Sequence, residues 1–121
     1  MRESSVLKDI ITRLSNTRTR LFRMQSGNYE LADGRHIVVG VQGMSDLIGC
    51  QSVIVTPEMV GKRIALFVAI EVKSLTGRVH PNQLDFVHIV KMLGGRAGIA
   101  RCVEDARAII EGTEAPTAAR G

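Results

Sequence analysis

The segment Ile64–Ser74 (IALFVAIEVKS) restricts the possible folds of this chain more than any other part of it. The segment is rich in β-branched and apolar residues, and its apolar run is nearly continuous until Glu71. Such a run is typical of a strand that is covered on both faces of its sheet. We therefore expect a buried central strand here.

Helix and strand patterns surround this segment. Apolar residues spaced three and four apart predict a helix that Ser4 and Ser5 precede and that Asn16 and Thr17 end. Pro81 and the pair Gly94-Gly95 predict another from Pro81 to Leu93. We expect further strands at 18–25, 36–39, 52–56 and 97–102, turns at 32–34 and 57–61, and a closing helix at 104–110. The core order is α-β-β-β-α-β-α, which takes in four of these five strands, and its late strand, helix and strand imply a crossover in an α/β architecture.

The length and composition fit one small domain. A chain of 121 residues with 45% hydrophobic residues can form one modest core, so we expect a single domain over residues 1–111. Residues 112–121 (GTEAPTAARG) are small and polar without periodicity, and we expect a disordered tail. Aromatic residues make up only 3%, which argues against a base-stacking platform, whereas the net charge of +4 allows an anionic partner such as nucleic acid.

Cysteine and hydrophobicity patterns suggest the compartment. Cys50 and Cys102 belong to no CxxC pair, so we expect two reduced thiols in or near the core. No zinc-type Cys/His spacing is present, and His36 and His88 are expected to be surface or packing residues. The N-terminus lacks a signal-peptide apolar region, and no apolar run approaches the ~20 residues of a membrane span. We expect a cytoplasmic protein, in a bacterium or a phage-infected cell.

Glu71 and Lys73 are the first candidate site residues. Because residues two apart in a strand share a face, this acid and this amine leave an otherwise apolar strand on the same side. Isolated charges are costly there, so they need each other or an ion. One interpretation is a salt bridge where the strand emerges into water, and the other is a catalytic site.

Asp46 could complete such a site. It lies between Gly43 and Gly49, and glycines permit a tight backbone path that could aim its carboxylate inward. The alternative is an aspartate of an Asx-turn or loop. Asp46 and Glu71 together would supply hard oxygens for Mg²⁺ or Mn²⁺, while Lys73 could orient or help deprotonate an attacking water. That division of labour suits phosphodiester hydrolysis.

Gln83 and Glu3, both in or beside predicted helices, each allow a functional and a purely structural interpretation. Gln83 shares a stripe with the apolar residues of its helix and could lie near the strand end bearing Lys73, or it could serve as a capping-box glutamine. Glu3 could point toward the sheet from the first helix, or it could simply be favoured by the helix macrodipole. Several basic residues could contact DNA phosphates or be ordinary surface charges: Arg18, Arg20, Arg23, Arg35, Lys62, Arg63 and Arg78.

Taken in order, these stretches resemble the VRR-NUC family of the PD-(D/E)xK, or restriction-endonuclease-like, superfamily, most closely its short standalone phage and bacterial members. The matching stretches are Leu21-Phe22-Arg23, Gly43-Met-Ser-Asp46-Leu-Ile-Gly49, Ala69-Ile-Glu71-Val-Lys73, Gly77-Arg78, Gln83 with Phe86, and Gly94-Gly95. Met24-Gln25 departs from the Asn that many members carry, and His80 from a small polar residue.

The resemblance implies a mixed four-stranded sheet flanked by helices. It also implies Asp46, Glu71 and the Val72 carbonyl as ligands of Mg²⁺ or Mn²⁺, and Lys73 as the catalytic lysine. Gln83 would be the helix glutamine of the family, and Glu3 the acidic residue of its first helix. Relatives of this kind cut branched DNA such as flaps and four-way (Holliday) junctions, and standalone forms resemble homodimeric resolvases. The expected function is a metal-dependent, structure-specific DNA endonuclease; the alternative is a non-catalytic DNA-binding or assembly module with the same fold.

Overall fold

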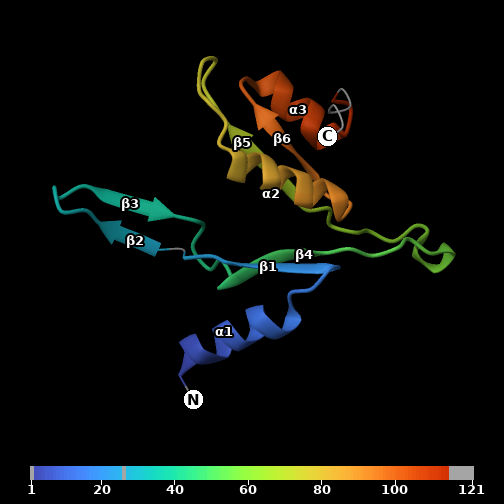
Figure 1. Ribbon diagram of the computed structural model, residues 1–121, viewed down its shortest axis with the longest axis horizontal. Helices are drawn as coiled ribbons and strands as arrows, with labels where there is room; N and C mark the ends of the chain where they lie inside the picture. Colours follow the sequence, from blue (N-terminus) through green and yellow to red (C-terminus); the bar gives the residue numbers. More distant parts are fainter. Residues whose placement is uncertain (1, 26, 115–121) are drawn as a thin grey trace. The chain divides into compact units, whose positions relative to one another are not determined.

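A computed structural model describes residues 2–25 and 27–114 of the chain. The chain divides into two compact units, Met1–Val53 and Ile54–Gly121, and each is described by itself below. Figure 1 labels the helices and strands of both units. Both contain helices and strands, so the predicted α/β class is confirmed. That the two units form a single domain stays a prediction.

The first unit consists of one helix and two antiparallel strand pairs. Strands β1 and β4 pair with Leu21 opposite Gly49, and β2 and β3 form a hairpin with Asn28 opposite Val38. Helix α1 contacts β1. The bounds of these elements are α1 Glu3–Leu14, β1 Thr19–Arg23, β2 Gly27–Glu30, β3 His36–Val39 and β4 Leu47–Gln51. The β1–β4 pair therefore carries Asp46 at its edge, directly before β4.

A glycine makes the β1–β4 pairing close. A Cβ atom added at Gly49 would overlap the main-chain carbonyl oxygen of Arg20. Only glycine fits where two backbones approach in this way. Gly49, three residues after Asp46, is thus required by the strand pairing itself.

The second unit is built on a parallel strand pair. Its elements are η1 Pro57–Met59, β5 Val68–Val72, α2 Pro81–Met92, β6 Arg96–Ala100 and α3 Val103–Glu111. Strands β5 and β6 pair in parallel, with Glu71 opposite Ile99 and Val72 opposite Ala100. Parallel neighbours need a crossover, and α2 supplies it, as the sequence predicts.

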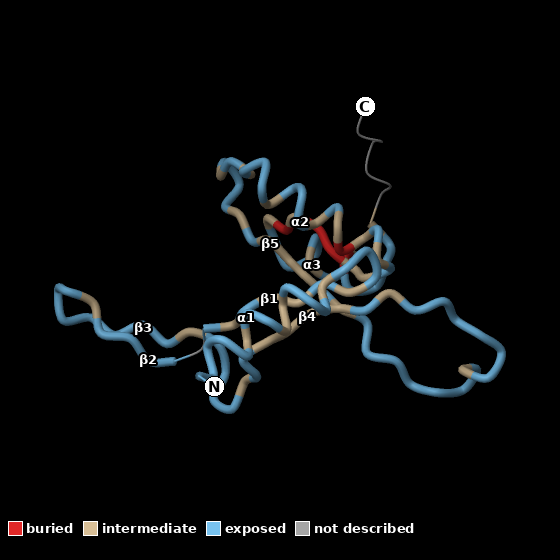
Figure 2. Tube along the Cα trace, turned by 60° about the horizontal axis from the view of Figure 1, so that its bottom comes forward, coloured by how far each residue is buried: buried red, intermediate tan, exposed pale blue. Residues whose placement is uncertain are grey.

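The core of this unit lies between β6 and its two helices. Val90 of α2, Ala97 and Ala100 of β6, and Ile109 of α3 are each 2% exposed or less. In Figure 2 the buried residues are drawn in red. A Cβ atom at Gly98 would meet Ile109 at 2.8 Å, so the small residues of β6 let α3 approach closely. Strand β6 is therefore the fixed element against which β5 and its charged end are aligned.

Most element boundaries agree with the sequence patterns to within about two residues, but one predicted strand is wrong. Residues 52–56 form no strand, and Val53, Ile54 and Val55 are exposed. The strand instead covers Leu47–Gln51, where Gly49 masks the apolar pattern. Strand preference depends on a partner, and here the partner β1 selects the earlier segment.

Two further expectations need correction. Strand β2 was not predicted, because Gly27 and Asn28 read as turn residues, whereas in the structure they pair with β3. Strand β5 covers only Val68–Val72 of the predicted segment and is not buried on both faces, since Val68 and Val72 are 42% and 73% exposed. The sheets of the described residues are two-stranded, and one four-stranded sheet stays a prediction.

The chain end and the membrane prediction can be checked only where the structure describes the residues. Gly112 ends α3 in the left-handed conformation at φ 72°, and Glu114 forms an ion pair with Lys91 at 3.1 Å, so residues 112–114 are held in place. The remainder of the predicted disordered tail, 115–121, lies outside the described residues.

No helix in the described part of the chain has the length and apolar character needed to cross a membrane.

The two cysteines are free thiols in different surroundings. Cys50 on β4 is half-buried, whereas Cys102 is exposed, so the expectation of a core or near-core thiol is wrong for Cys102. Cys102 is the N-cap residue directly before α3, and it faces solvent here. Burial raises the pKa of the Cys50 thiol, and the positive charge of Arg20 opposes that rise.

This difference predicts unequal alkylation of the two cysteines. Because the thiolate is the nucleophile, a raised pKa and partial burial slow the reaction of Cys50. We expect iodoacetamide at pH 8 to modify Cys102 first, as measured by mass spectrometry of the two cysteine peptides over time. The rates should converge in concentrated urea. Equal rates in the native protein, or faster modification of Cys50, would contradict the described packing of β4.

Candidate functional site

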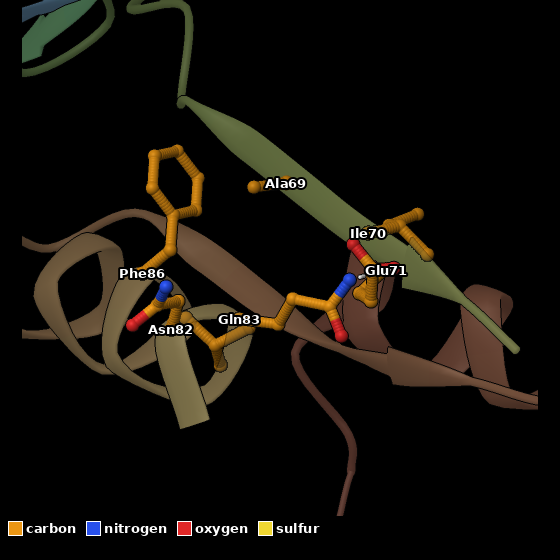
Figure 3. A pocket seen from close by; sticks show the side chains of 7 residues that line it. Ala69, Ile70, Glu71, Asn82, Gln83 and Phe86 are labelled. Atoms are coloured by element: carbon orange, nitrogen blue, oxygen red, sulfur yellow. Dashed lines mark hydrogen bonds between the residues drawn. The ribbon is translucent and has the colours of Figure 1, made fainter. Parts of the chain in front are cut away.

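The charged end of β5 and the start of α2 form a connected cluster. Glu71 is the penultimate residue of β5, Lys73 follows the strand, and Gln83 lies in the first turn of α2. The Lys73 Nζ atom lies 3.4 Å from Glu71 Oε1, and Gln83 Nε2 donates to the same oxygen at 2.8 Å. Figure 3 shows Gln83 extended toward Glu71. The structure thus brings together three of the residues that the sequence analysis selects.

This ion pair is not an ordinary surface salt bridge. The Lys73 side chain is 17% exposed and the Glu71 side chain 33%, and an amide donor supplements the ammonium. A partly buried carboxylate with two donors is held in one orientation, because losing either donor would leave the charge poorly solvated. Both contacts fall on Oε1, so Oε2 is the oxygen that a ligand could share.

Gln83 combines the two roles that the sequence leaves open. Its Oε1 accepts from the His80 main-chain N–H at 3.0 Å, which is one half of a capping box, while its Nε2 donates to Glu71. One amide can do both because its oxygen and nitrogen point in opposite directions. The helix cap therefore fixes the donor that holds the carboxylate.

A pocket of about 230 Å³ adjoins this cluster. It is lined by Ala69, Ile70, Glu71, Asn82, Gln83, Phe86 and Val87 (Figure 3). Its walls are largely apolar, so the Glu71 carboxylate lies at the border between apolar side chains and solvent. Such a border strengthens electrostatic contacts relative to open water.

Asp46 lies in a different pocket, within the first unit. Its volume is about 510 Å³, and its lining residues are Glu3, Ser4, Leu7, Arg23, Met24, Gln25, Tyr29 and Asp46. Gly43, at φ 83°, allows the turn before Asp46, and the Asp46 carbonyl accepts from Met24 N–H at 2.8 Å. This pocket brings Glu3 and Asp46 together, two acids that are 43 positions apart by their numbers. Their presence beside Arg23 was not predicted from the sequence.

The candidate phosphate contacts are all exposed and are divided between the units. Arg18, Arg20, Arg23 and Arg35 belong to the first unit, and Lys62, Arg63 and Arg78 to the second. Arg35 pairs with Asp33 at 2.7 Å, which offsets part of its charge, and Arg23 lines the Asp46 pocket. His36 and His88 are exposed, in agreement with the expected surface positions.

Replacing Gln83 with alanine should destabilise the protein. The Gln83→Ala variant loses both the His80 cap and the donor to Glu71, at a cost of about 1–2 kcal/mol. Asn82→Ala, on the next residue, is the control and should change the free energy of unfolding by less than about 0.5 kcal/mol. Urea denaturation followed by circular dichroism measures both. Equal stabilities of the two variants would mean that the Gln83 contacts contribute nothing.

Comparison with known proteins bears on the family of this chain. Searches of curated proteins and of solved structures found no match. The family model described as the VRR-NUC domain matches residues 4–104, a range that covers most of both units and contains Glu71, Lys73 and Gln83. The small mixed α/β architecture is consistent with the restriction-endonuclease-like fold of this family. The chain therefore belongs to the VRR-NUC family of PD-(D/E)xK-like nuclease domains.

Proposed function

We propose that this nuclease is a Mg²⁺- or Mn²⁺-dependent endonuclease that hydrolyses phosphodiester bonds of branched DNA. The observation that carries the proposal is the partly buried cluster of Glu71, Lys73 and Gln83 in a chain of a nuclease family. A module that only binds DNA gains nothing from a lysine directed at a carboxylate instead of at a phosphate. The cluster therefore favours the enzyme over the non-catalytic alternative.

The donor set proposed for the metal ion is Asp46, Glu71 and the Val72 carbonyl. Carboxylate and carbonyl oxygens are hard ligands of the kind that Mg²⁺ and Mn²⁺ prefer. Among residues 2–25 and 27–114, no three His, Cys, Asp or Glu side chains gather as a metal cluster, but the proposed set needs only two carboxylates. When bound, such an ion lowers the pKa of a coordinated water and offsets negative charge on the phosphate.

The direction of the Val72 carbonyl is compatible with the proposed role. Lys73 N–H donates to Ala100 O at 2.9 Å, so the main-chain groups of Lys73 face β6. Successive residues of a strand direct these groups to opposite edges, and the Val72 carbonyl therefore points away from β6. The set requires that Asp46 come to this edge of β5.

Lys73 would act on the nucleophile and on the phosphate. Its Nζ atom, already held beside Glu71 Oε1, can donate to an attacking water and orient it. A cation at this position also offsets the charge that develops on the phosphoryl oxygens. Gln83 would keep Glu71 in the orientation that this arrangement needs. Glu3, which lines the pocket of Asp46, would be a second acid near the first ligand.

Substrate binding would rest on exposed arginines. Arg18, Arg20, Arg23, Arg35 and Arg78 are the residues that we propose contact DNA phosphates. Phosphate contacts give affinity without sequence preference and are weakened by salt. A domain of this size offers limited surface to a branched duplex. A homodimer with two-fold symmetry would enlarge that surface and place two cuts symmetrically, as a four-way junction requires.

Nuclease assays test the proposed chemistry directly. We expect cleavage of labelled flap and four-way junction DNA in Mg²⁺ or Mn²⁺, weaker cleavage of linear duplex, and none in EDTA. The variants Asp46→Asn, Glu71→Gln and Lys73→Ala should each lower the rate by about 10²–10⁴-fold while DNA binding persists. Matched exposed replacements, Asp9→Asn, Glu104→Gln and Lys8→Ala, should leave the rate unchanged.

Two results would decide against this chemistry. Cleavage that survives EDTA, or that persists in Lys73→Ala, would contradict the proposed roles of the metal ion and the lysine. Binding of junction DNA without cleavage under every metal condition would favour the non-catalytic module.

The proposed dimer has its own test. Sedimentation equilibrium at micromolar concentration should give about twice the 13.2 kDa of one chain. Addition of junction DNA should yield a complex with two chains per junction. A monomer in both experiments would contradict the dimer but would leave the cleavage chemistry as it stands.

A further inference from the structure

Arg101 forms a clamp on the turn that follows β5. It is the first residue after β6, and its Nη1 atom donates to three main-chain carbonyl oxygens of that turn. The distances are 2.5 Å to Ser74 O, 3.3 Å to Leu75 O and 2.9 Å to Gly77 O. A guanidinium that meets several carbonyl dipoles is a charge-assisted contact, stronger than one between neutral groups.

Lys73 lies directly before the turn residues that Arg101 contacts. Its N–H donates to Ala100 O at 2.9 Å, and the carbonyl of the next residue, Ser74, accepts from Arg101. Two adjacent residues at the end of β6 therefore fix the main chain on both sides of Lys73. The turn also folds back on itself, with Gly77 N–H donating to Ser74 O at 3.2 Å.

Other forces hold this turn weakly. Ser74, Leu75 and Thr76 are exposed, and Leu75 is 82% exposed, so apolar burial does not fix their conformation. Arg101 is in turn anchored to α3, because its main-chain N–H donates to Asp105 Oδ2 at 2.9 Å. The contacts run without interruption from α3 through Arg101 and the turn to Lys73, and from Lys73 to Glu71.

We propose that Arg101 is a positioning residue that holds Lys73 beside Glu71. This inference rests on the proposed function only in linking Lys73 to cleavage; the positioning itself concerns the second unit alone. The three main-chain carbonyls are all contacted by the Nη1 donor of Arg101. A displacement of about 1 Å at a reacting group can cost about a hundredfold in rate, which is why a clamp remote from the substrate matters.

The first test does not need activity. The chain has four lysines, Lys8, Lys62, Lys73 and Lys91, so a sample labelled with ¹³C at lysine Cε gives a simple spectrum. Lys73→Arg assigns the Lys73 signal by its loss. In Arg101→Ala the Lys73 signal should shift toward that of a solvated lysine. Arg107→Ala removes an equal charge from an exposed pair with Glu104 on α3 and should leave the Lys73 signal unchanged.

The second test separates rate from binding. On junction DNA, Arg101→Ala should lower kcat by about ten- to a hundredfold with KM nearly unchanged. Arg101→Lys keeps the charge but lacks the planar fork, so kcat should recover in part. A raised KM with unchanged kcat would show that Arg101 binds the DNA and would overturn the proposal.

The two tests distinguish failure of the inference from failure of the nuclease assignment. If wild-type protein cleaves no DNA but the Lys73 signal still moves in Arg101→Ala, positioning stands and the proposed function fails. If Arg101→Ala does not fold, Arg101→Lys takes its place, with a smaller expected shift. A Lys73 signal identical to wild type in the folded Arg101 variant overturns the inference, whatever the activity.

Discussion

The account depends on one oxygen atom, Glu71 Oε1, which receives Gln83 Nε2 at 2.8 Å and lies 3.4 Å from Lys73 Nζ. A carboxylate at the end of an apolar strand must be compensated, because desolvation penalises the lone charge. Here two donors compensate it from two elements, β5 with its following turn and the first turn of α2. Neither the lysine nor the glutamine can move without loosening the acid, so the cluster behaves as a unit.

The parallel pairing of β5 and β6 makes this arrangement possible. Ala97, Gly98 and Ala100 are buried and small, so β6 lies close to the helices and acts as the fixed strand. Ala100, the last residue of β6, accepts a hydrogen bond from the Lys73 main-chain N–H. Arg101, the next residue, donates to the turn that follows Lys73. The packed core thereby restrains charged residues that are only partly buried. A site on a free loop would lack this restraint.

The sequence predicted the helices and the β5–α2–β6 crossover, because these depend on local spacing and capping chemistry. It also selected Glu71, Lys73 and Gln83, but left a salt bridge and a helix cap open as alternatives to a site. It misplaced the strand near residue 50, since the apolar run at 52–56 has no partner while Leu47–Gln51 pairs with β1 through Gly49. Pairing is a long-range choice that local preference does not encode. Arg101 was missed for a similar reason: it lay inside a predicted strand, and nothing in its neighbours indicates contact with a turn 24 to 27 residues earlier.

The proposed function requires that Asp46 and Glu71 bind the same divalent cation. Paramagnetic broadening by Mn²⁺ in amide NMR spectra tests it most directly. The account predicts that substoichiometric Mn²⁺ broadens the signals around Asp46 and around Glu71 in parallel, and that Glu71→Gln removes both effects. Broadening confined to one of the two regions, or broadening near Asp46 that persists in Glu71→Gln, would contradict the shared site.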